Sequence, residues 1–283
     1  MSKFIVNSKA KINLSLDILS KREDGYHNLS MIMHTVNLCD TLTFDEKKEK
    51  EISLSSNLPY LPCDSKNIVY KAYETFYNNS GVEKQGFDIH INKSVPVCAG
   101  LDGGSTNAAS TLLFLNRYHN NPLSLDTLMK IGKELGADVP YGIIGGTCLA
   151  EGIGEKLTSL PSLPECYIVI AKPQNKGLST KSIFSMVNIA DISLHPDTHG
   201  MIKALYDGDL KGVCKRMYNV LEYYSVKESP EISKYKEILI ACDALGALMS
   251  GSGNAVFGIF ETKEAAEEAF SNLKKETSLT FLV

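Results

Sequence analysis

The sequence has no long apolar run and no excess of positive charge. No stretch approaches the roughly 20 apolar residues of a membrane span, and residues 1–7 lack the apolar core of a signal peptide. The net charge is −4 at pH 7, so the chain lacks the electrostatic footprint of a protein that binds nucleic acid or an anionic membrane. We therefore expect neither nucleic acid nor a membrane as a partner.

Disulfide and zinc signatures are missing as well. The seven cysteines are widely scattered, odd in number and never arranged as a C-x-x-C pair. This pattern is typical of reduced thiols in a cytoplasmic protein rather than of a disulfide framework or a zinc site. Cys98 lies beside a glycine-rich loop, where a catalytic thiol is one interpretation and a small apolar filler is the favoured one.

The composition that is present is that of an ordinary globular protein, with 43% hydrophobic and 22% charged residues. Because 283 residues exceed a typical single domain, we expect two lobes that share a cleft. We assign residues 1–155 to the first lobe and 156–283 to the second. Strand-like and helix-like segments alternate without strict βαβ repetition, which favours the α+β class.

The most informative stretch is the glycine-rich loop 96–106. Gly100, Gly103 and Gly104 precede Ser-Thr-Asn, the residue types that cap a helix, and then a helix over 108–115. The alternating segment 87–93 before the loop predicts a strand. A glycine turn at a helix N-terminus presents N–H donors at the positive end of a dipole, which suits a phosphate.

The loop matches neither of the two commonest phosphate-binding motifs. A Walker A loop needs a lysine after its last glycine, and Gly104 is followed by Ser105. The glycine spacing does not fit G-x-G-x-x-G either. A tight structural turn before a buried helix therefore remains the alternative interpretation.

Three polar residues elsewhere stand in positions of interest. Segment 10–18 alternates as a strand, with Lys11 and Asn13 together on the face opposite its apolar residues. Asp138 follows a helix that starts at Ser124 and is capped by Gly136, and Pro140 is expected to hold Val139 extended. Taken alone, the first pair predicts only a solvated strand face, and the aspartate only a turn.

The remaining elements follow from periodicity and capping residues. Asp64 and Ser65 are expected to cap a helix, and the pair His195 and His199 indicates a loop and helix cap rather than a metal site, because Pro196 interrupts it. We expect strands at 31–44, 52–55, 167–172, 247–249, 255–260 and 279–283, a hairpin at 145–154, and helices at 66–77, near Thr180, at 199–207, at 229–242 and from Lys263.

Together these segments resemble one family, the 4-diphosphocytidyl-2-C-methyl-D-erythritol kinases of the galactokinase, homoserine kinase, mevalonate kinase and phosphomevalonate kinase superfamily. The motifs that carry the resemblance occur in the expected order: Lys11–Leu16, Asp24–His27, Pro96–Thr106, Gly136–Pro140 and Met249–Gly253. Shorter matches extend it almost end to end: Lys172–Pro173, Ser179–Lys181, His195–Thr198 and Asn219–Glu222. The Asp-Gly-Tyr-His element distinguishes this family from its superfamily relatives.

The resemblance implies a phosphotransferase that uses ATP and Mg²⁺. It implies transfer of the γ-phosphoryl group to the 2-hydroxyl of a substrate that carries a cytidine diphosphate group, in the non-mevalonate route to isoprenoids. It also implies an N-terminal ribosomal-protein-S5-like lobe, a C-terminal ferredoxin-like lobe, and an active site in the cleft between them. We expect a monomer or a weak homodimer.

The same resemblance assigns roles to individual residues. Asp138 corresponds to the catalytic acid that accepts the substrate proton, and Lys11 to the cation that keeps it ionised. Asn13, Tyr26, His27 and Thr180 correspond to the substrate site. The triphosphate loop comprises Pro96, Ala99, Gly100, Leu101, Asp102, Gly103, Gly104, Ser105 and Thr106, with Gly251 and Gly253 closing its phosphate side.

Three positions depart from the family pattern. Asp102 stands where glycine or alanine is usual, and a carboxylate about 6 Å from a phosphate charge costs roughly 3 kcal/mol at an effective dielectric constant near 20, unless it points outward or helps to hold Mg²⁺. His34 and Asn37 replace glutamine and aspartate. Besides the family activity, two functions therefore stay open: a superfamily kinase for another small alcohol, and a binding-only paralogue with a weakened phosphate loop.

Overall fold

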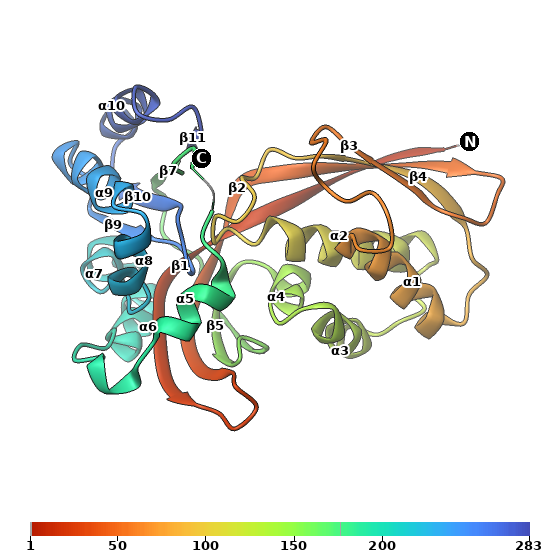
Figure 1. Cartoon of the computed structure of the whole chain (residues 1–283), viewed down its shortest axis with the longest axis horizontal. Helices are drawn as coiled ribbons and strands as arrows, with labels where there is room; N and C mark the ends of the chain where they lie inside the picture. The colour runs from red at the N-terminus through yellow and green to blue at the C-terminus, as the bar shows by residue number, and fades with distance from the viewer. Residues whose placement is uncertain (1, 176) are drawn as a thin grey trace. The chain divides into compact units, whose positions relative to one another are not determined.

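The computed structural model describes residues 2–175 and 177–283. It is an α+β fold, as predicted, and it separates into two compact units (Figure 1). Unit 1 consists of the described residues of Met1–Ala10, Asn37–Val95 and Asp102–Gly145, and unit 2 of Lys11–Val36, Pro96–Leu101 and Gly146–Val283. The chain therefore passes between the units several times, and the lobe boundary at residue 155 stays a prediction.

The sheet of unit 1 explains the first expected strands. Strand β2 (His27–Lys47) pairs antiparallel with β4 (Gly86–Asn92), and β4 pairs parallel with β3 (Ser53–Ser56). Alternation turns Phe87, Ile89 and Ile91 of β4 inward. These strands confirm the predictions at 31–44, 52–55 and 87–93.

Four helices lie on one face of this sheet (Figure 1): α1 (Ile68–Ser80), α2 (Gly103–Tyr118), α3 (Leu125–Leu135) and α4 (Val139–Ile144). Their apolar faces meet the strands in one continuous hydrophobic core. Phe44 stacks on Phe114 at 4.0 Å between ring centroids, and Phe87 meets Phe114 edge to face. The core thus anchors α2, the helix that follows the predicted loop, on the sheet.

Two expected helix starts are wrong. Helix α2 begins at Gly103, so Ser105, Thr106 and Asn107 lie inside it instead of capping it. Helix α1 begins at Ile68, where the side chain of Asn67 accepts a hydrogen bond from the Val69 N–H, whereas Asp64 closes the preceding turn. Helix α1 thus uses a cap a few residues after the expected ones, whereas α2 begins before all three of its candidates.

Helix α3 confirms the predicted helix, whereas the prediction for Val139, which follows it, is wrong. Ser124 caps α3 by accepting from the Thr127 N–H, and Gly136 is its C-cap. Val139 is not extended, as expected from Pro140, but is the first residue of α4. Proline is tolerated there because the first turn of a helix needs no N–H for an internal hydrogen bond.

Unit 2 contains two groups of strands. Residues of β1 (Lys3–Lys21) pair in parallel with β8 (Tyr218–Asn219), and residues 29–34 of β2 pair antiparallel with β5 (Thr147–Gly152). Strand β5 forms a hairpin with β6 (Lys156–Leu160), so the hairpin predicted at 145–154 extends further, to residue 160. The second sheet has the antiparallel order β11 (Thr280–Leu282), β7 (Tyr167–Ala171), β10 (Val256–Phe260) and β9 (Gly246–Met249). All four of its strands were expected.

The helices of unit 2 are α5 (Thr180–Met186), α6 (Thr198–Tyr206), α7 (Leu210–Lys215), α8 (Glu222–Glu228), α9 (Glu231–Ala241) and α10 (Lys263–Lys274). The Asp197 side chain caps α6, which confirms a loop and cap at 195–199. The short helices α7 and α8 were not predicted, because six or seven residues are too few to show a clear period.

Candidate active site

Lys11 and Asn13 are buried, with only 3% and 1% of their surface exposed, so the interpretation as a solvated strand face is wrong. The Lys11 ammonium donates to the Gly100 carbonyl oxygen at 3.0 Å and to the Asn13 side-chain oxygen. The Lys11 N–H also donates to the Leu101 carbonyl oxygen. Within unit 2, Lys11 and Asn13 therefore lie next to the first half of the predicted phosphate loop.

A second glycine turn, Ser250–Gly253, completes this cluster in unit 2. The Ser250 hydroxyl donates to the Gly100 carbonyl oxygen at 2.8 Å and accepts from the Asn13 N–H at 3.2 Å. Gly100 has φ +75°, and a Cβ there would lie 2.1 Å from the Ser250 carbonyl oxygen. Only glycine fits this contact, which supports the importance given to Gly100 from the sequence.

The rest of the phosphate loop belongs to unit 1. Asp102 is left-handed at φ +56° and precedes the first helical turn, which contains Gly103, Gly104, Ser105 and Thr106. A Cβ on Gly103 would lie 2.9 Å from the Lys93 ammonium, which is buried in an ion pair with Asp40. The first N–H groups of α2 have no partner within the helix, as at any helix start, and donors of this kind suit an anion, so the phosphate-binding role of the loop stays a prediction.

Asp138 occupies the N-cap position of α4 and makes no side-chain capping hydrogen bond. Helix α4 packs closely on α2: a Cβ on Gly142 would lie 2.7 Å from the Ala109 Cβ and 3.3 Å from the Thr106 Cα. The half-buried Asp138 therefore starts a helix that is packed against the phosphate-loop helix. Lys11 belongs to the other unit, so its pairing with Asp138 stays a prediction.

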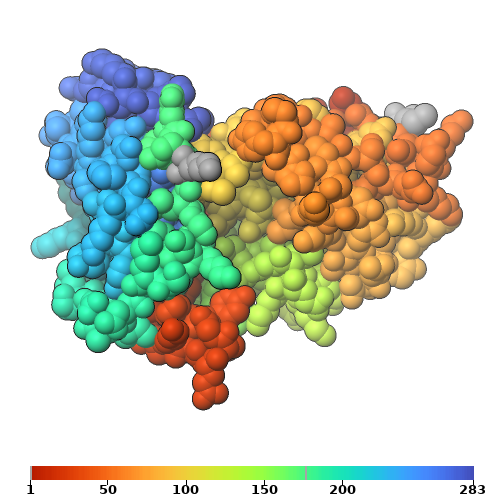
Figure 2. Space-filling view, viewed as in Figure 1, coloured from red at the N-terminus to blue at the C-terminus, as the bar shows by residue number. Residues whose placement is uncertain are grey.

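The turn between β1 and β2 protrudes beside the segment that contains α5 (Figure 2). Tyr26 is 59% exposed, whereas His27 is 7% exposed and lies 5.4 Å from Phe184 between ring centroids. Among the residues that the structure describes, none is a hydrogen-bond partner of the buried His27 Nε2 atom. Burial, and to a lesser degree Lys21, lower the pKa of His27, so its ring is neutral near pH 7.

Sequence reasoning missed Phe184, although it stands four residues after Thr180 on the same helix and such a spacing places two side chains on one face. The Thr180 hydroxyl lies 2.9 Å from that of Ser252, so this predicted residue reaches the second glycine turn.

Two of the positions that depart from the family pattern have polar partners. His34 contacts the Thr147 hydroxyl at 2.7 Å, and burial lowers the pKa of His34 to about 4. Asn37 accepts a hydrogen bond from Lys9.

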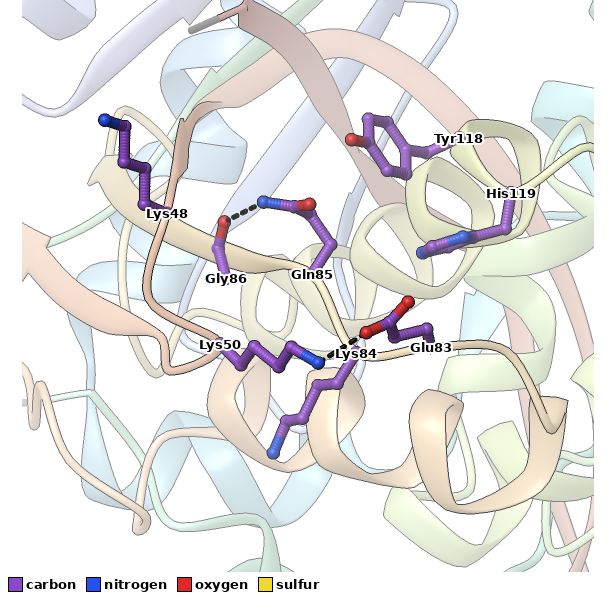
Figure 3. Close-up of a pocket in the computed structure, with 8 residues that line it drawn as sticks. All are labelled: Lys48, Lys50, Glu83, Lys84, Gln85, Gly86, Tyr118 and His119. Carbon is purple, nitrogen blue, oxygen red and sulfur yellow. Dashed lines mark hydrogen bonds and ion pairs between the residues drawn. The ribbon is translucent and has the colours of Figure 1, made fainter.

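Unit 1 also contains a cavity of about 450 Å³ (Figure 3). It is lined by Lys48, Lys50, Glu83, Lys84, Gln85, Gly86, Tyr118 and His119. Lys50 is paired with Glu83, and Lys84 with Glu74, so acidic partners neutralise two of its three lysines. None of the predicted site residues lines this cavity.

Within residues 2–175 and 177–283, no three His, Cys, Asp or Glu side chains are grouped so that they could hold a metal ion. In the same part of the chain, the helices are all too short or too polar to cross a membrane.

Comparison with known proteins gives a consistent result. Residues 67–147 match the model of the GHMP kinases N terminal domain, and residues 201–278 match that of the GHMP kinases C terminal domain. The 4-diphosphocytidyl-2-C-methyl-D-erythritol kinase of Clostridium kluyveri is 44% identical over 278 residues and 98% of both chains. The Alkaliphilus metalliredigens protein of the same name is 41% identical over 283 residues, which is all of this chain and 97% of that protein.

Solved structures agree. A crystal structure of 4-(cytidine 5'-diphospho)-2C-methyl-D-erythritol kinase superposes with a TM-score of 0.83 and 29% identity, over 99% of this chain and 98% of that one. Homoserine kinase from Cytophaga hutchinsonii superposes with a TM-score of 0.80 at 20% identity, over 100% of this chain and 94% of that one, which shows a shared fold. The chain therefore belongs to the 4-diphosphocytidyl-2-C-methyl-D-erythritol kinase family of the GHMP kinases.

Proposed function

We propose that this protein transfers the γ-phosphoryl group of ATP to the 2-hydroxyl of 4-(cytidine 5'-diphospho)-2-C-methyl-D-erythritol, in the non-mevalonate route to isoprenoids. Family membership supports the reaction class. The observation that supports this substrate is the buried Nε2 atom of His27 beside the ring of Phe184, for which residues 2–175 and 177–283 provide no hydrogen-bond partner. A buried polar atom without a partner is costly, and a ligand with a polar edge would satisfy it.

Cytosine has the required chemistry, because its flat ring stacks on aromatic side chains and its edge carries donors and acceptors. His27 would hydrogen-bond that edge while Phe184 packs against the ring. Tyr26, which is exposed at the neighbouring turn, would add a second aromatic contact. Thr180 and Asn13 would contact the rest of the substrate, which leads from the base towards Lys11.

The triphosphate would bind at the start of α2. The N–H groups of Gly103, Gly104 and Ser105 stand at the positive end of this helix of 16 residues. Mg²⁺ in kinases is held largely by the phosphates, with only one or two protein oxygens, and the hydroxyl oxygens of Ser105 and Thr106 would be available to it at the start of α2. When bound, the ion neutralises charge on the transferred phosphoryl group.

Asp138 would accept the proton of the attacking hydroxyl. Its position at the start of α4, a helix that packs closely on the phosphate-loop helix α2, supports this role. The Lys11 ammonium would keep the aspartate ionised and stabilise charge on the reacting oxygens. This pairing requires the two units to form a common cleft. We expect the two lobes to be of the ribosomal-protein-S5-like and ferredoxin-like types, and the protein to be a cytoplasmic monomer or weak dimer.

The test is ADP release by the purified chain with Mg-ATP, with and without the cytidine substrate. We expect substrate-dependent release, and a loss in kcat of about 10²–10⁴-fold in Asp138→Asn, the range that general bases contribute. His27→Ala should raise KM for the cytidine substrate and leave KM for ATP unchanged, whereas the exposed control His199→Gln should change neither. Full turnover by Asp138→Asn would show that Asp138 is not the general base.

Two alternative functions give different results in the same assay. A kinase for another small alcohol would release ADP with acceptors that lack cytidine, and His27→Ala would then have no effect. A binding-only paralogue would release no ADP with any acceptor, yet would still bind the cytidine compound.

A further inference from the structure

The segment Asn219–Glu222 has no role in the reaction as described so far. Asn219 is buried at the end of β8, with 2% of its surface exposed. Its Nδ2 atom donates to the Met249 carbonyl oxygen at 2.9 Å and to the Gly251 carbonyl oxygen at 2.8 Å, and its Oδ1 atom accepts from the Leu221 N–H at 3.0 Å. Both amide protons are used, so the side chain has one orientation that satisfies all three bonds.

Glu222 holds the same turn from its other side. Its Oε2 atom accepts from the Met249 N–H at 2.9 Å, and its Oε1 atom pairs with Lys236. The N–H and the carbonyl of Met249 are therefore both bound by one short segment, and the second glycine turn begins at the next residue.

The second glycine turn also determines the surroundings of Lys11. The Ser250 hydroxyl and the Lys11 ammonium donate to the same acceptor, the Gly100 carbonyl oxygen, at 2.8 and 3.0 Å. A Cβ on Gly251 would lie 3.2 Å from the Gly100 Cα and 3.4 Å from the Lys11 ammonium. A shift of the turn therefore shifts either the carbonyl or the ammonium.

We propose that Asn219 is a positioning residue for phosphoryl transfer, which acts through the second glycine turn and the Gly100 carbonyl to set the place of the Lys11 ammonium. The part of Lys11 in the reaction rests on the proposed function. The placement of Lys11 by Asn219 can be measured without turnover.

The decisive variant is Asn219→Asp, which keeps the shape and the acceptor for Leu221 but turns carboxylate oxygen towards two carbonyls. We expect kcat to fall about a hundredfold, the effect of a displacement near 1 Å in a reacting group, while KM for the cytidine substrate stays nearly unchanged. As pH falls, the buried carboxyl becomes protonated and can donate to one carbonyl, so the ratio of variant to wild-type kcat should rise. A residue that only fills space would give a constant ratio.

The matched control is Asn116→Asp in unit 1. Asn116 is 6% exposed, donates to the Leu123 carbonyl oxygen and accepts from the Leu123 N–H. Replacing its amide with a carboxylate should therefore destabilise the protein in the same way as Asn219→Asp does. Its kcat per folded molecule should match wild type at every pH. Ser250→Ala should reproduce the loss seen in Asn219→Asp, and the double variant should lose no more than either single one.

A second measurement does not need the reaction. Lys11 is 3% exposed, so an amine-reactive label followed by mass spectrometry should modify it slowly in the wild type, faster in Asn219→Asp and slowly in Asn116→Asp. Equal labelling in all three proteins would overturn the inference, whatever the turnover. Wild-type protein without substrate-dependent ADP release would instead count against the proposed function alone, and the labelling result would still decide on Asn219.

Discussion

The first glycine turn, Pro96–Thr106, and the second, Ser250–Gly253, both place residues in the left-handed region of backbone conformation, but different interactions hold them. In the first turn, two of the three such residues are not glycine: Cys98 at φ +52° and Asp102 at φ +56°, beside Gly100 at +75°. In the second turn, both are glycine. The first turn therefore carries more backbone strain.

Side chains account for the second turn. Asn219, Glu222 and Ser225 each bind a backbone group within or next to it, and Ser250 ties it to Gly100. In the first turn, side-chain hydrogen bonds from Lys11 and Ser250 converge on the Gly100 carbonyl oxygen, and close packing around Gly100 and Gly103 adds to them. Side-chain hydrogen bonds therefore reach the second turn at several backbone groups, whereas in the first turn they converge on one carbonyl oxygen.

The largest effect is expected from a side chain added to the first turn. Gly100→Ala combines strain at φ +75° with a Cβ 2.1 Å from the Ser250 carbonyl oxygen. The Ser250 backbone cannot move aside as a flexible side chain could, so one of the two turns must shift. We expect a loss of stability above about 4 kcal/mol, the range of severe core changes, with little soluble protein. Thermal denaturation and yield of the purified protein measure it.

Gly104→Ala is the matched variant, because nothing lies within 4 Å of its Cβ position. The melting temperature should stay at or slightly above the wild-type value, since alanine favours a helix. Similar losses in both variants would show that packing around Gly100 does not hold the turn.

The next effect concerns the charge in the first turn. Asp102→Gly suits the left-handed conformation at φ +56° and removes a carboxylate from the helix end proposed for the triphosphate. We expect KM for Mg-ATP to fall by up to about a hundredfold, which corresponds to the roughly 3 kcal/mol of a charge at about 6 Å. Asp102→Asn should give most of this effect at nearly constant size. A rise of KM in both variants would indicate that the carboxylate helps to hold Mg²⁺.

Much of the fold could be predicted from local patterns. The alternation in 10–18 and 87–93 predicted strands, and Ser124 and Gly136 predicted both ends of one helix, because such signals depend on neighbours in sequence. The starts of α1 and α2 could not be predicted, because Asp64, Ser65 and Asn67 are all capable caps and tertiary packing selects one of them.

The candidate site divides in the same way. Lys11 and Asn13 could be singled out by their shared strand face, but their burial depends on Gly100 and Ser250, which are distant in sequence. Phe184 lies on a helix too short for a clear period. Long-range contacts of this kind leave no trace in spacing, so the sequence can suggest the residues but not their surroundings.

The smallest predicted effect removes one support of the second turn. Ser225 is fully buried and donates to the Ser252 carbonyl oxygen at 3.0 Å. Ser225→Ala should cost about 1–3 kcal/mol for a lost buried hydrogen bond, seen as a lower melting temperature, while kcat stays near wild type because Asn219 and Glu222 still bind the turn. The exposed control Ser271→Ala, which loses a bond to the Glu267 carbonyl oxygen, should change stability by less than about 0.5 kcal/mol. A large loss of kcat without a change in melting temperature would contradict this account, because it would mean that Ser225 acts on the reaction itself and that the supports of the turn are not shared among several side chains.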